Sequence, residues 1–255
     1  MTKRASATGR FLCAMVIAAS LAGCAMPQPG ATRTPAEADA IGQVSRVRRL
    51  LRTACSRLKA ANEGAANRAA QMAEAGSDTA DALEQWNGFI KGSAGRAPRV
   101  YANHPQWVAA TAEISDGIAE MLRQVEKDNP GMAFKACGAT CGKFVVLNEQ
   151  AGVRRTSDVL FHFRKAATPL ALPAAKGDVA AVAPVVGTLL KLRDRSLTDP
   201  VGGVGTPAQR DGALRAFSAA VDAFAAAVNG NESGGLAELY GGMMACMESA
   251  YDLYL

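Results

Sequence analysis

The sequence has little histidine and few aromatic residues, and it has no apolar run long enough to span a membrane. Only 2 of its 255 residues are histidine, and aromatic residues make up 5%. A membrane-spanning helix needs about 20 consecutive apolar residues. The chain also lacks a Gly-x-Ser-x-Gly elbow and a phosphate-loop signature. These absences remove the usual markers of hydrolases and nucleotide-binding enzymes, so we expect a protein that is not an enzyme and has no cofactor.

The composition favours helices and argues against nucleic-acid binding. Alanine and leucine are abundant, whereas runs of β-branched and aromatic residues are scarce, which predicts an all-α fold. The formal charge of the chain is +5, but Lys3, Arg4 and Arg10 contribute three positive charges within the first 23 residues, which contain no acid. The remaining chain therefore carries only +2. Such a near-balance argues against the extensive basic surface that nucleic-acid binding requires.

The first 23 residues have the three parts of a secretory leader. The basic residues precede an apolar segment over 11–20, and small residues lead to Leu21-Ala22-Gly23-Cys24. This tetrapeptide resembles the lipobox of bacterial lipoproteins. The resemblance implies cleavage before Cys24 and addition of fatty acyl chains, palmitate among them, to that cysteine. Several acyl chains together hold a protein stably on a membrane.

The lipobox also implies a location and a domain order. In that class the residue after the cysteine influences sorting, and Ala25 differs from the aspartate that resembles an inner-membrane retention signal. We therefore expect an outer-membrane anchor facing the periplasm. The predicted order is a signal peptide (1–23), a lipidated proline-rich tether (24–35) and a helical bundle (36–255).

Apolar residues recur every three or four positions along most of the remaining chain, which predicts an antiparallel helical bundle. The glycine-rich stretch Gly202-Gly203-Val204-Gly205 follows no strand and predicts a flexible loop. The expected helices cover residues 36–75, 78–91, 106–127, 132–150, 156–167, 179–195, 209–228 and 236–255.

A weak internal repeat suggests two four-helix units in tandem, over 36–150 and 151–255. Val47-Arg48-Arg49 in the first half matches Val153-Arg154-Arg155 in the second. The alternative is chance, because alanine-rich helices align easily with one another.

Four cysteines remain after the leader and Cys24 are set aside: Cys55, Cys137, Cys141 and Cys246. An even number in an oxidising compartment predicts two disulfides that staple the bundle. Cys137 and Cys141 lie one helical turn apart, too far for a direct bridge. We therefore expect each to pair with Cys55 or Cys246, and we favour Cys55 with Cys141 and Cys137 with Cys246.

The run Cys137-Gly138-Ala139-Thr140-Cys141-Gly142 bears on haem binding. A helical bundle with paired cysteines is faintly similar to the cytochrome c-prime family, but that family carries Cys-x-x-Cys-His. Both the spacing and the histidine are missing here, so haem is not expected. No pair of residues has zinc-finger spacing, and no Cys-x-x-Cys suggests thioredoxin-like chemistry. We therefore predict no metal site and a structural role for the cysteines.

An aromatic cluster in a loop is the remaining candidate site. Tyr101, His104 and Trp107 surround Pro105 and form a candidate exposed binding rim; a loop packed by its own aromatics is the alternative. The leading interpretation is a non-enzymatic lipoprotein that works through contacts with another envelope protein, in a structural, scaffold or immunity-type role. The alternative is a binding module for a small apolar or envelope ligand.

Overall fold

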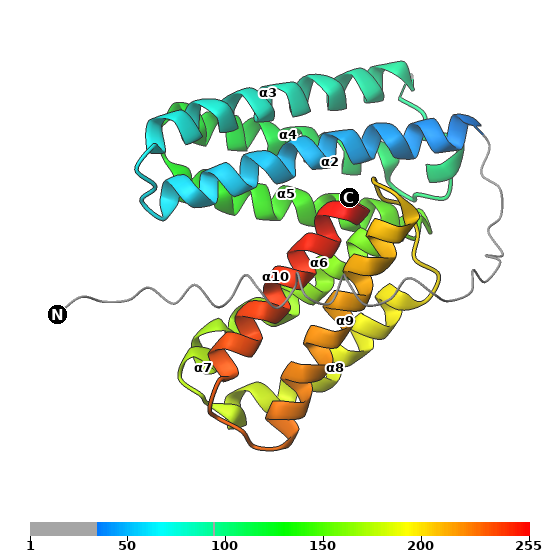
Figure 1. Ribbon diagram of the computed structural model, residues 1–255. Helices are drawn as coiled ribbons and strands as arrows, with labels where there is room; N and C mark the ends of the chain where they lie inside the picture. Colours follow the sequence, from blue (N-terminus) through cyan, green and yellow to red (C-terminus); the bar gives the residue numbers. More distant parts are fainter. Residues whose placement is uncertain (1–34, 94) are drawn as a thin grey trace. The chain divides into compact units, whose positions relative to one another are not determined.

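The computed structural model describes residues 35–93 and 95–255. Within these ranges the chain forms helices and no strands, which confirms the all-α prediction (Figure 1). The predicted signal peptide, most of the predicted tether and the predicted lipidation site Cys24 lie outside the described residues. The chain divides into two compact units, which we call the N-terminal unit (31–154) and the C-terminal unit (155–255).

The N-terminal unit is a bundle of four long helices. Each of them packs against two others, so that α2 and α4 both contact α3 and α5 (Figure 1). The short connections over 63–67 and 127–129 make α2 antiparallel to α3 and α4 antiparallel to α5. The helices are α2 (Pro35–Asn62), α3 (Arg68–Gly92), α4 (Trp107–Glu126) and α5 (Pro130–Gln150), with a 3-10 turn, η3 (Arg99–Tyr101), before α4.

Regularly spaced apolar side chains form the core of this unit. Val44, Val47 and Leu51 lie on one face of α2 and are fully buried. Trp86 of α3 packs edge to face against Phe144 of α5, with ring centroids 5.0 Å apart. Such aromatic pairs add about 0.5–1.5 kcal/mol to the gain from burial.

The expected end of the first helix at residue 75 is wrong, and so is the expected start of the second helix at residue 78. Helix α2 stops at Asn62 and α3 begins at Arg68. Gly64 adopts φ +82° in the intervening turn, a conformation that favours glycine. The turn was not predicted because residues 63–67 contain no proline and only one glycine, so their composition resembles that of the flanking helices.

The C-terminal unit has the same packing order as the first. Helix α6 contacts α8 and α10, and α9 contacts the same two. Phe163 of α6 and Phe217 of α9 meet at 4.7 Å between ring centroids in the core. The helices are α6 (Thr156–Ala167), α7 (Ala171–Ala175), α8 (Val179–Leu197), α9 (Pro207–Asn229) and α10 (Leu236–Tyr254), with a 3-10 turn, η4 (Thr168–Leu170), after α6.

The glycine-rich stretch between α8 and α9 is held in place, in contrast to the flexible loop expected. The amide of Val201 donates to Thr156 Oγ1 at 2.7 Å, and the amide of Val204 donates to the carbonyl of Leu253 at 2.7 Å. Gly202 has φ +89°, and a Cβ added there would lie 2.9 Å from Nε of the buried Arg155. Glycine is needed here because the guanidinium passes directly over the backbone.

Candidate functional site: the cysteine cluster

Three cysteines of the N-terminal unit meet where α2 packs against α5. Cys55 follows Leu51 by one turn on the buried face of α2, and its side chain is 8% exposed. Cys137 and Cys141 lie one turn apart on α5, at 0% and 7% exposure. Since residues four apart share a helix face, both α5 cysteines are directed to the same neighbouring helix.

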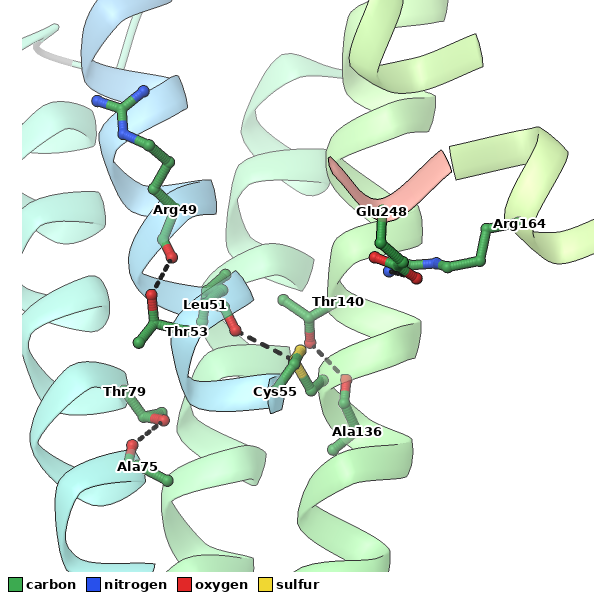
Figure 2. Close-up of a disulfide and its surroundings, with 11 residues drawn as sticks. Arg49, Leu51, Thr53, Cys55, Ala75, Thr79, Ala136, Thr140, Arg164 and Glu248 are labelled. Atoms are coloured by element: carbon green, nitrogen blue, oxygen red, sulfur yellow. Dashed lines mark hydrogen bonds and ion pairs between the residues drawn. A yellow bond between two sulfur atoms is a disulfide. The ribbon is translucent and has the colours of Figure 1, made fainter. Parts of the chain in front are cut away.

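A disulfide joins Cys55 to Cys137 (Figure 2). The two Cα atoms are 5.9 Å apart, within the usual range for a bridge. The carbonyl oxygen of Leu51 lies 3.6 Å from Sγ of Cys137. The bridge therefore connects the first and the last long helix of this unit, which are far apart in the sequence.

The favoured pairing of Cys55 with Cys141 and Cys137 with Cys246 is wrong. Cys137 does not pair with Cys141, as their spacing on α5 predicted. Its partner is Cys55 of α2, which was expected to pair with Cys141. Cys246 is buried on α10 of the C-terminal unit and is itself disulfide-bonded, but not to Cys137. Two disulfides were expected, and one bridge lies between residues that the structure describes.

Cys141 completes a triangle of sulfur atoms. The Sγ atoms of Cys55, Cys137 and Cys141 all lie within 4.8 Å of one another. Among the described residues, this is the only group of three or more histidine, cysteine or acidic side chains close enough to hold a metal ion. Sequence reasoning found these cysteines but did not find their convergence, because Cys55 is 82 residues away from Cys137.

The three side chains of the candidate binding rim are buried, which agrees with a loop packed by its own aromatics and not with an exposed rim. Tyr101, His104 and Trp107 are 1%, 6% and 6% exposed. The Tyr101 hydroxyl donates to Asn148 Oδ1 at 3.1 Å, and the ring packs at 5.3 Å from that of Trp107. These residues anchor the loop before α4 and offer no surface to a ligand.

His104 is held in one tautomer by the same loop. The amide of Gln106 donates to His104 Nδ1 at 3.1 Å, so Nδ1 is an acceptor and the neutral ring carries its proton on Nε2. Burial lowers the pKa of His104. Its Nε2 and the Trp107 Nε1 are buried with no hydrogen-bond partner among the described residues. The second histidine, His162, is half-buried on α6.

A shallow basic groove lies on α2 and α3, with a cavity volume of about 260 Å³. Its lining includes Arg46 and Arg49 of α2 and Gln85 of α3. Burial, and then the positive charge of Arg46, lower the pKa of Arg49. Two neighbouring guanidinium groups in one groove favour an anionic occupant.

Comparisons with known proteins returned no relative. No family model matches the chain, and no curated protein or solved structure matches it. Within residues 35–93 and 95–255, none of the helices has the length and apolar character needed to cross a membrane.

Proposed function

We propose that this protein is a lipid-anchored envelope protein, held at the outer membrane through Cys24 and acting without catalysis through contacts with another envelope protein. The observation that carries the proposal is Leu21-Ala22-Gly23-Cys24 directly after a leader-like apolar segment. The Cys55–Cys137 bridge supports it, because structural disulfides persist mainly in oxidising compartments such as the periplasm.

Fatty-acid labelling of the full chain tests the anchor. The wild-type protein should incorporate labelled palmitate and sediment with outer membranes, whereas Cys24→Ala should incorporate none and leave the membrane fraction. Cys13→Ala is the matched control, because Cys13 lies within the predicted leader and its loss should leave labelling unchanged. Equal labelling of Cys24→Ala and the wild type would contradict the proposal.

The proposed role in contacts with another envelope protein has a direct test. Crosslinking in intact cells, followed by purification under denaturing conditions, should recover one dominant envelope protein. Recovery of the protein without any crosslinked species would contradict this role.

A binding module is the second candidate function. The basic groove on α2 and α3 is the candidate binding surface, because the aromatic loop that was first considered for this role is buried. An anionic envelope ligand would fit two arginines better than a small apolar ligand would. Native mass spectrometry of the purified full chain should then show a stoichiometric adduct, which the Arg46→Ala/Arg49→Ala variant should lose. An unliganded spectrum would remove this candidate.

A further inference from the structure

We propose that Cys55, Cys137 and Cys141 form a binding site for a soft, thiophilic metal ion of the Cu(I) class when the bridge is reduced. This inference goes beyond the proposed function and does not depend on the lipid anchor. It starts from the sulfur triangle, in which all three Sγ atoms lie within 4.8 Å of one another.

The triangle has the size that a three-coordinate thiolate site needs. Metal–sulfur bonds of about 2.3 Å place the sulfurs of such a site about 4 Å apart. The separations in the cluster are already within 4.8 Å, and opening the bridge lets its two sulfurs separate towards the same spacing. No large movement of α2 or α5 is required.

The ligand set selects the kind of ion. Three thiolates with no histidine or carboxylate among the clustered ligands favour soft ions such as Cu(I) over Mg²⁺, Ca²⁺ or Mn²⁺. A structural zinc ion normally takes four protein ligands, and the described cluster provides three. Cu(I), which is stable with three sulfur ligands, is therefore the better match.

Loading requires a dithiol reductant, and the reaction balances with it. The dithiol transfers two electrons and two protons to the bridge, giving thiols at Cys55 and Cys137 and a cyclic disulfide of the reductant. Cu(I) then binds the three sulfurs while the thiols release their protons to solvent.

Anaerobic titration of the reduced, detergent-solubilised full chain with Cu(I), in competition with a chromogenic Cu(I) chelator, tests the site. The wild type should withdraw one tight equivalent and develop thiolate-to-metal charge-transfer absorption. The oxidised wild type should withdraw none at this site. Cys141→Ser should lose the tight equivalent, although its Cys55–Cys137 bridge and circular dichroism before reduction stay unchanged.

Cys246→Ser is the matched control, because it removes a buried cysteine of the other unit and should keep the tight equivalent. Equal Cu(I) affinity of the Cys141→Ser variant and the wild type would overturn the proposal. Loss of helical circular dichroism in the wild type upon reduction would overturn it too, since the site requires the reduced bundle to stay folded.

Discussion

At the residue scale, His104 shows how burial converts an expected surface group into part of the interior. Its Nδ1 accepts from the Gln106 amide, and its ring packs edge to face on Trp107 at 6.4 Å. Protonation of Nδ1 would remove this acceptor and place a charge in a buried position. The folded state therefore binds a proton at His104 less readily than the unfolded chain does, which agrees with the lowered pKa.

This difference predicts a pH-dependent stability. Because the folded pKa of His104 lies below the unfolded value of about 6.5, the unfolded state binds more protons as the pH falls past that value. The free energy of unfolding should fall as the pH is lowered from about 6.5 towards the folded pKa. Urea unfolding at several pH values measures this slope.

The chain offers a matched control for the histidine prediction. His104→Gln should flatten the slope near pH 6, whereas His162→Gln, which removes the other histidine and leaves the aromatic loop intact, should retain it. An unchanged slope in the His104 variant would assign the pH dependence to other groups.

At the element scale, helices α2 and α5 show what their sequences could and could not predict. The apolar stripe of Val44, Val47 and Leu51 was sufficient to predict α2 and its buried face. The choice of bridge could not be predicted, because Cys137 and Cys141 lie on the same face of α5 and both approach Cys55. The packed aromatic loop was one of the two interpretations of Tyr101, but its hydrogen bond to Asn148 could not be predicted, because the two residues are 47 positions apart.

Because the sulfurs of Cys137 and Cys141 both lie near that of Cys55, we predict that Cys141 can replace Cys137 as the disulfide partner of Cys55. Cys137→Ala should form a Cys55–Cys141 disulfide, because Cys141 is then the remaining sulfur of the triangle. Non-reducing peptide mapping of protein secreted into an oxidising compartment would identify it. Cys141→Ala is the control and should keep the Cys55–Cys137 bridge; a reduced Cys55 in the Cys137 variant would contradict the prediction.

At the scale of the whole molecule, the two units share one order of packing. In each, four long helices are arranged so that consecutive helices are neighbours and the last returns to the first. This common order agrees with the weak repeat in the sequence. The duplication stays a prediction, because a four-helix unit built from short connections adopts this arrangement readily.

The Cys55–Cys137 bridge lies within the N-terminal unit, so a reductant that opens it should lower the stability of that unit. In the chain-entropy model, closing a loop of this length stabilises the folded state by about 4–5 kcal/mol. Differential scanning calorimetry should show that the transition of this unit moves to lower temperature with a dithiol, and the Cys55→Ala/Cys137→Ala variant should show the same lower temperature without it. A single transition would indicate that the units unfold together.

The bridge between α2 and α5 also determines how the chain would carry a mechanical load. The polypeptide enters the N-terminal unit at α2 and leaves it after α5. A pull between the N-terminal segment and the C-terminal unit would pass from α2 through the Cys55–Cys137 bond into α5. The segment between the two cysteines, including α3 and α4, would bear no tension, so the covalent bond limits how far that unit can be extended.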